Sequence, residues 1–292
     1  MKSLELFEID TWEGPFTEEL QKKAVRSLEN GKVLYFPNLA FPLADQEKKF
    51  LDPQKVDPKA KNISYDRRND KLGGTLYEQQ DREEQKALIR RYASSSRHFL
   101  DHLIPHYRQH LIQARTSLRP VEIAGRTSSW RKDDTRLHVD AFPSSPTKGQ
   151  RILRMFTNIN PEGKPRVWRL GEPFQDVVKT YAPTASRPIP GVAYLMKWFG
   201  ITKDLRTRYD HYMLKLHDQM KADLNYQECA PQEEFHFPPG SSWIVYTDQV
   251  SHAAMSGQHV FEQTFHVPVQ GLYDRTTSPL GILEQYLKKS LI

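Results

Sequence analysis

The sequence predicts an α+β fold with a sheet or barrel core flanked by helices. Segments with helical periodicity come first along the chain and as insertions, whereas strand-like segments gather in a second half divided by prolines and glycines. Helices and strands do not alternate regularly, which argues against a parallel βαβ sheet. We find no internal repeat and no low-complexity linker. We therefore expect residues 1–292 to form a single domain with helical N-terminal and inserted segments.

The first half contains one clear strand pattern and one long helix pattern. Residues 31–41, GKVLYFPNLAF, are predicted as a buried strand that ends at Pro37 and Asn38. Residues 81–114 are polar with periodic apolar positions, and they are predicted as a helix interrupted at Pro105. Histidines recur at every fourth position of this helix, without a carboxylate at ligand-like spacing, so we interpret them as a solvated or partner-facing row rather than a second metal site: His98, His102, His106 and His110.

The second half is predicted to supply most of the sheet. Residues 136–142, RLHVDAF, and 150–161, QRILRMFTNINP, are predicted as strands joined by a turn-rich loop. A helix is expected over residues 205–224, and residues 235–269 follow a pattern of strand, turn and strand. The tail, residues 278–292, has leucines near helical spacing beside two lysines. We expect this tail to be a helix docked on the core, with an interfacial membrane helix as the alternative.

Composition points to an anionic partner. The net charge is +6 and the sequence pI is near 9.2, which suits nucleic acid, a lipid surface or an acidic small molecule. Much of this charge lies between Arg115 and Arg136. The single cysteine, Cys229, excludes an internal disulfide. No apolar run reaches the roughly 18 residues of a membrane span, and the N-terminus lacks a signal-peptide pattern, so a cytoplasmic location is expected.

A candidate metal site begins with His138 and Asp140, which form the His-x-Asp triplet of the strand predicted over residues 136–142. Residues i and i+2 of a strand point to the same face, so an imidazole nitrogen and a carboxylate oxygen would project together. These are two of the three ligands of a facial triad for non-haem Fe(II). Among the histidines outside helical segments, His252 has the best context, because it follows the apolar strand SSWIVYTD and precedes small residues. We predict His138, Asp140 and His252 as metal ligands and catalytic residues.

With His252 placed 114 residues after His138, the chain resembles the iron- and 2-oxoglutarate-dependent dioxygenases. That resemblance implies a double-stranded β-helix (jelly-roll) core. It also implies Fe(II) as the metal, 2-oxoglutarate and O2 as co-substrates, and ascorbate as a reductant. Three segments resemble the Kdo hydroxylases more closely: residues 61–66 (KNISYD), residues 129–161, and residues 166–174 (RVWRLGEPF). Those enzymes place a hydroxyl on C3 of Kdo, the acidic sugar of the lipopolysaccharide inner core.

The distal carboxylate of 2-oxoglutarate needs a cation. Many relatives carry an arginine about eleven residues after the distal histidine, where this chain has Gln263. Arg154, on the strand predicted after His-x-Asp, is our first choice, and its alternative role is a salt bridge to an internal Glu or Asp. Arg126 is the second choice for this anchor.

The resemblance to the Kdo hydroxylases implies a Kdo-bearing lipid A precursor as the substrate, and we expect peripheral contact of the enzyme with the cytoplasmic face of the inner membrane. Candidates for binding it are four further arginines near the metal motif and an aromatic wall for the sugar ring: Arg131, Arg136, Arg166, Arg169 and Trp168, together with Arg126. Two alternatives stay open. One is a dioxygenase acting on nucleic acid or protein, although no nucleic-acid-binding module is recognised. The other is a non-enzymatic jelly-roll binding module.

Overall fold

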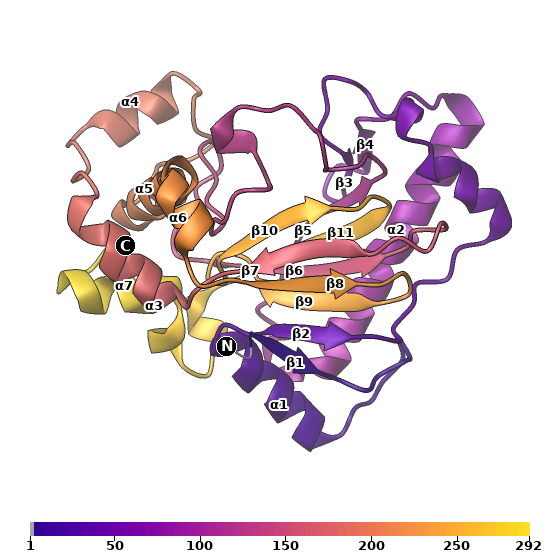
Figure 1. The fold of residues 1–292 in the computed structure, drawn as a ribbon, viewed down its shortest axis with the longest axis horizontal. Coiled ribbons are helices and arrows are strands. Elements are labelled where there is room, and N and C mark those ends of the chain that lie inside the picture. The colour runs from indigo at the N-terminus through magenta and orange to yellow at the C-terminus, as the bar shows by residue number, and fades with distance from the viewer. Residues whose placement is uncertain (1–2) are drawn as a thin grey trace.

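The computed structural model describes residues 3–292 and arranges them as two facing β-sheets with helices outside them (Figure 1). The strands are β1 (Leu4–Leu6), β2 (Val33–Phe36), β3 (Ile63–Asp66), β4 (Lys71–Gly73), β5 (Ile112–Arg119), β6 (Arg151–Asn158), β7 (Arg166–Leu170), β8 (Glu233–Phe237), β9 (Ser242–Tyr246), β10 (His252–Ser256) and β11 (Val260–Val267). The helices are α1 (Glu18–Glu29), α2 (Gln79–Leu103), α3 (Phe174–Tyr181), α4 (Val192–Trp198), α5 (Arg208–Ala222), α6 (Leu224–Cys229) and α7 (Pro279–Leu287). The predicted α+β class is confirmed.

The large sheet has the strand order β1-β2-β9-β6-β11-β5-β3-β4, and the small sheet has the order β10-β7-β8. In the large sheet, β6 lies antiparallel between β9 and β11, with Arg154 opposite Thr264 and Phe156 opposite Glu262. Successive side chains of a strand point to opposite faces. Arg154, Phe156 and Glu262 therefore share one face of the large sheet, and Gln263 points to the other.

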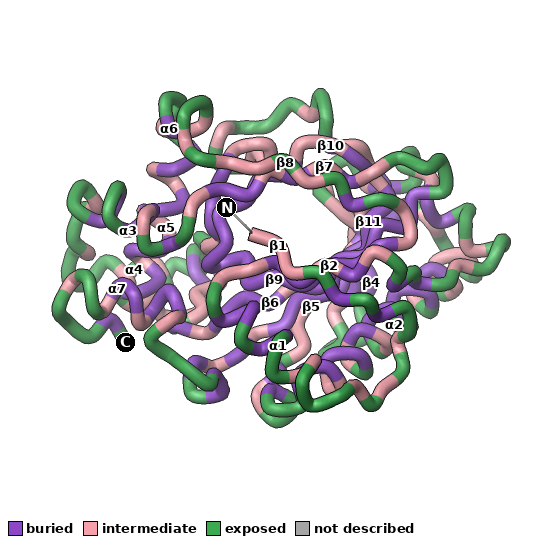
Figure 2. Tube along the Cα trace, turned by 60° about the horizontal axis from the view of Figure 1, so that its bottom comes forward, coloured by how far each residue is buried: buried purple, intermediate pink, exposed green. Residues whose placement is uncertain are grey.

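Each face of the large sheet has its own covering layer. Helix α2 covers one face, where Tyr92 stacks on Phe261 of β11 with ring centroids 4.6 Å apart. The small sheet covers the other face, where Trp168 of β7 meets Phe156 of β6 edge-on at 5.0 Å. Figure 2 shows the resulting band of buried backbone through β6, β9 and β11. Among the side chains of the large sheet, those on the Arg154 face therefore point toward the small sheet.

Two predicted elements differ from the structure. The helix predicted over residues 81–114 ends at Leu103, because Pro105 cannot continue it. The chain turns there and starts β5 at Ile112. Residues 136–142 do not form a strand beyond a single bridge between His138 and His252. The segment crosses from the small sheet to the end of β9, where the amide of Asp140 donates to the carbonyl of Thr247, so it cannot continue a ladder with either sheet.

The remaining predicted elements are present. Strand β2 lies within residues 31–41, β6 within 150–161, α5 within 205–224, and β8 to β11 largely within 235–269. The tail forms α7 and packs onto the core, because its leucines at positions 280, 283 and 291 are at most 5% exposed. This burial removes the apolar face that an interfacial tail would need. Within residues 3–292, no helix combines the length and hydropathy required to cross a membrane.

The histidine row of α2 packs against other segments. His98 Nε2 lies 2.8 Å from a carboxylate oxygen of Glu13. His106, just past the helix, stacks on Tyr273 at 3.9 Å. These contacts place two of the four histidines against other segments of the chain.

Candidate active site

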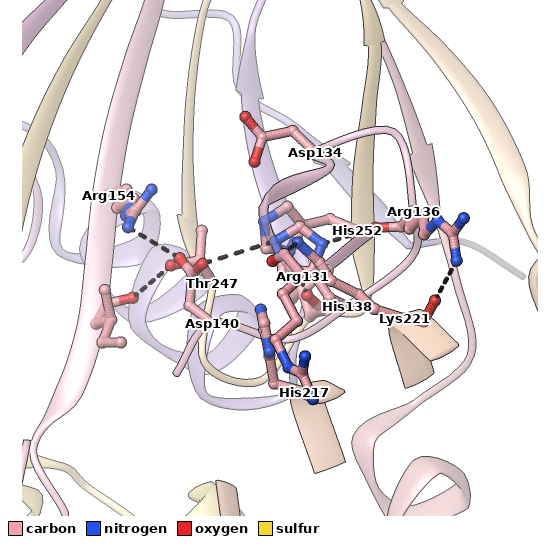
Figure 3. Close-up of polar contacts among 12 residues, drawn as sticks. Arg131, Asp134, Arg136, His138, Asp140, Arg154, His217, Lys221, Thr247 and His252 are labelled. Carbon is pink, nitrogen blue, oxygen red and sulfur yellow. Dashed lines mark hydrogen bonds and ion pairs between the residues drawn. The ribbon is translucent and has the colours of Figure 1, made fainter. Parts of the chain in front are cut away.

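The three predicted ligands converge from two segments that are paired through their backbones (Figure 3). His138 and His252 exchange two backbone hydrogen bonds, of 3.0 and 2.9 Å, which fixes β10 beside the His-x-Asp segment. Two residues later, the hydrogen bond from Asp140 to Thr247 turns the carboxylate toward the same centre. The potential ligand atoms of His138, Asp140 and His252 all lie within 4.8 Å of one another. No other group of this kind occurs in the described part of the chain.

Backbone carbonyls fix the tautomers of both histidines. His138 Nδ1 lies 2.7 Å from the carbonyl oxygen of Arg136, and His252 Nδ1 lies 2.8 Å from that of Val250. Each ring therefore donates through Nδ1 and keeps the Nε2 lone pair free. His138 Nε2 is 3.8 Å from Asp140 Oδ1. Two free imidazole nitrogens and a carboxylate on one side of a centre are the donor set of a facial triad.

Electrostatics keep this donor set in its metal-binding protonation state. Burial lowers the pKa of His138 well below its ordinary 6.5, and the charges of His252 and Lys221 lower it further. Burial also lowers the pKa of His252, although the Asp140 charge opposes this shift. Burial alone would raise the pKa of Asp140, but the charges of Arg154 and the two histidines outweigh it and lower the pKa. The site therefore holds two neutral imidazoles and one carboxylate, the forms that ligate metals.

We expect metal affinity to hold as the pH falls toward 6.5 and to weaken only below it, because both histidine pKa values lie under that value. The native histidines then bind fewer protons than the unfolded ones. The free energy of unfolding of the metal-free protein consequently rises with pH up to about 6.5. Co(II) titrations followed by visible absorbance, from about pH 8 to about pH 5, measure the affinity. Loss of half the affinity already between about pH 8 and 7 would contradict this protonation scheme.

Arg154 links the triad to a buried ion-pair network. Its Nη2 lies 3.0 Å from Asp140 Oδ2, and its Nη1 lies 3.3 Å from Glu262 Oε1. Arg119 of β5 pairs with the other oxygen of Glu262. The predicted alternative for Arg154, an internal salt bridge, is thus present with two acids. Its Nε–H is nevertheless buried without a hydrogen-bond acceptor among residues 3–292.

The triad lies in a cavity of about 730 Å³ between the sheets and helix α5. Seven basic side chains line it against three aspartates. The basic residues are Lys61, Arg119, Arg131, Lys132, Arg154, Arg166 and Lys221. On one wall, Trp168 stacks on the His252 ring at 5.1 Å, and its indole N–H is buried without a partner within the described residues. A cavity with this charge is suited to an acidic ligand.

The predicted binding residues divide between the cavity and its surroundings. Arg154, Arg131, Arg166 and Trp168 line the cavity. Arg136 does not, because it turns back to donate 2.7 Å to the carbonyl of Lys221. Arg169 points away on the opposite side of β7, where it contacts Gln232.

Both alternative anchors also lie outside the cavity. Gln263 faces α2 and accepts a hydrogen bond from the Thr116 hydroxyl, because the alternation of β11 turns it away from the face that carries Glu262. Arg126 lines a neighbouring cavity instead. Neither Gln263 nor Arg126 therefore lies among the residues that line the cavity of the triad.

Sequence reasoning missed several cavity residues. Lys61 belongs to the KNISYD segment, and its Nζ lies 2.7 Å from Asp134 Oδ1. His217 and Lys221 come from α5, one helical turn apart on its buried face, and the His217 ring meets that of His138 edge-on at 5.5 Å. A capping box between Thr207 and Asp210 starts this helix. The spacing of His217 and Lys221, four residues apart on the buried face of a helix, was the sequence signal that could have identified them as cavity residues.

Comparisons with known proteins agree with this geometry. A family model described as 3-deoxy-D-manno-oct-2-ulosonic acid (Kdo) hydroxylase matches residues 11–290. Solved structures of the Kdo hydroxylase KdoO, a non-haem Fe(II) α-ketoglutarate-dependent dioxygenase, share 54% identity and cover 99% of this chain and 97% of theirs. The complex with α-ketoglutarate and Fe(III) superposes with a TM-score of 0.96, and the cobalt(II) complex with 0.97. A search of curated proteins gives no match.

Proposed function

Since the chain belongs to the Kdo hydroxylase family, it is an Fe(II)- and 2-oxoglutarate-dependent dioxygenase, and we propose that it hydroxylates C3 of Kdo on a lipid A-linked inner-core precursor. The predicted jelly-roll core is confirmed by the similarity to KdoO. Kdo is a 3-deoxy sugar acid, so C3 carries hydrogens and no hydroxyl. The reaction proposed at that carbon replaces one hydrogen by hydroxyl.

The donor set supports iron as the metal. His138, Asp140 and His252 would hold it, because their free Nε2 atoms and carboxylate meet at one centre while backbone carbonyls hold both imidazole rings. When bound with 2-oxoglutarate and O2, the iron supplies the oxidising power for insertion of oxygen into a C–H bond. The protein supplies orientation, charge and a cavity from which water can be excluded.

The observation that carries the proposal is a set of buried guanidinium groups that each keep one donor without an acceptor among residues 3–292. Three cavity arginines, Arg119, Arg154 and Arg166, each bury an Nε–H that has no acceptor within residues 3–292. A buried donor left unsatisfied costs about 1–3 kcal/mol, so three in one cavity favour a ligand rich in carboxylate or phosphate oxygens. The carboxylates of 2-oxoglutarate and of Kdo provide such acceptors.

The cavity cations differ in their contacts, and we assign them different roles. Arg154 contacts the triad itself, so we assign it to the distal carboxylate of 2-oxoglutarate. Burial, together with the charge of Arg119, lowers the pKa of Arg166 to about 9, which leaves it protonated near neutral pH. We assign Arg166 and Lys221 to the sugar acid, with Trp168 as the apolar wall for its ring.

Mass spectrometry of candidate substrates tests the proposal. The enzyme is incubated with Fe(II), 2-oxoglutarate and ascorbate, and offered a Kdo-bearing lipid A precursor, the same lipid without Kdo, or single-stranded DNA. We expect a gain of one oxygen only on the Kdo lipid, with fragmentation placing it on C3. Oxidation of the DNA with the Kdo lipid untouched would overturn the proposal. Oxygen on the lipid lacking Kdo would show that the sugar is not the target.

A further inference from the structure

The segment around α4 exposes an unusual run of large apolar side chains. Six of them within 13 residues are 52–79% exposed, and we call them the α4 patch: Ile189, Tyr194, Leu195, Trp198, Phe199 and Ile201. The other exposed large hydrophobic residues of the described chain are scattered over distant elements, apart from Val192 inside this segment. Figure 1 shows α4 at the margin of the molecule, on the outer side of α5. A contiguous exposed apolar surface of this kind marks an interaction site.

The patch is held in place by contacts at both of its ends. Before α4, the carbonyl of Ser186 lies 2.8 Å from His211 Nε2 of α5. After α4, Thr202 is buried, and the amide of Lys203 donates 2.8 Å to the carbonyl of Ser144. These contacts fix an ordered helix whose apolar side chains face outward.

Basic residues lie beside the patch. Beside the patch lies a groove of about 550 Å³ whose lining includes Arg187, Arg206, Arg208 and Lys215. The acid nearest in sequence to α4, Asp204, is already paired with Lys148 and Lys197. An apolar centre with a cationic rim complements an anionic lipid surface, since aromatic side chains enter the headgroup region while lysines and arginines meet lipid phosphates.

The patch also lies close to the cavity. Leu214 and Asp218 of α5 line both the groove beside α4 and the cavity of the triad. The two are therefore separated by a single helix, about 10 Å across. If the substrate is the lipid-linked sugar of the proposed function, on which this step rests, its acyl chains can stay in the bilayer while the sugar reaches the metal site.

We propose that the α4 patch docks the enzyme on an anionic phospholipid bilayer beside the opening of the active-site cavity. The test measures co-sedimentation with phosphatidylcholine vesicles that contain phosphatidylglycerol, or lack it. The patch variant is Trp198→Ser/Phe199→Ser. The matched control, Leu224→Ser/Tyr273→Ser, removes two side chains that are 60% and 64% exposed elsewhere.

We expect wild type and control to bind the anionic vesicles, and the patch variant to bind about tenfold or more weakly, because each apolar group withdrawn from the interface loses transfer free energy. Hydroxylation of a vesicle-embedded Kdo lipid should fall in the patch variant, while hydroxylation of a deacylated, water-soluble Kdo acceptor should not. Absent wild-type binding, or equal binding by the patch variant, would overturn the docking proposal. The proposal would also be overturned if the wild-type protein formed a dimer that the patch variant does not form, and neither protein bound vesicles. Vesicle binding without hydroxylation of either acceptor would instead count against the proposed function alone.

Discussion

Replacing Asp140 by alanine is expected to abolish metal binding and turnover while leaving the fold intact. Asp140 is the only carboxylate in the group of three potential ligands that the described chain brings together, so its loss removes the charge that neutralises a divalent ion. We expect turnover to fall roughly a thousandfold or more, the equivalent of about 4 kcal/mol of activation free energy. Metal content after gel filtration and hydroxylation rate are the two measurements.

Asp134→Asn provides the matched control. Asp134 lines the same cavity and its pKa is also lowered, because the neighbouring charges of Lys61 and Arg119 outweigh burial, but it is outside the triad. This variant should retain stoichiometric metal. Near-normal iron content and hydroxylation in Asp140→Ala would show that the triad assignment is wrong. Melting temperatures of both variants separate loss of metal from loss of fold.

The sequence allowed the triad to be predicted because its signals are local. The spacing of His138 and Asp140 puts two donors together over one short segment, and the apolar strand before His252 identified the third. The strand predicted to carry His138 and Asp140 was nevertheless too long. Residues 136–142 make only one bridge, because the chain leaves the small sheet to reach Thr247. The side chains of His138 and Asp140 still project to the same centre across that crossing, so the three predicted ligands converge with less strand than was predicted.

The rest of the cavity is assembled from distant segments, and this defeats local reasoning. Lys61, Arg119 and Lys221 come from a loop, from β5 and from α5, and nothing in the sequence relates their positions. Strand β5 was not predicted, because the helix predicted over residues 81–114 overlaps its first residues. Conversely, Arg136 was chosen because it flanks the metal motif, and Arg169 because it belongs to the segment RVWRLGEPF, yet both lie outside the cavity. Backbone direction, not position along the chain, decides which side chains enter it.

The second large effect is expected from Arg154→Ala, which should raise the KM for 2-oxoglutarate about 30- to 150-fold, the equivalent of about 2–3 kcal/mol. In the metal-free site, Arg154 and Arg119 face Asp140 and Glu262, so two cations balance two acids. A metal held by Asp140 would draw on the negative charge of the carboxylate that Arg154 Nη2 contacts, and this would weaken the pairing of Arg154 with Asp140. Its charge then becomes available to a new carboxylate, and the distal end of 2-oxoglutarate fits that need. Metal should therefore bind before the co-substrate.

Three variants separate this role from a structural one. Arg154→Lys keeps the charge without the planar fork and should recover part of the affinity for 2-oxoglutarate. Arg126→Ala should behave as wild type, because Arg126 lines a different cavity. Arg119→Ala tests the other guanidinium on Glu262. A KM defect in Arg119→Ala but not in Arg154→Ala would move the anchor to β5. If Arg154→Ala instead weakened Co(II) binding and left the KM unchanged, Arg154 would position Asp140 and would not hold the co-substrate.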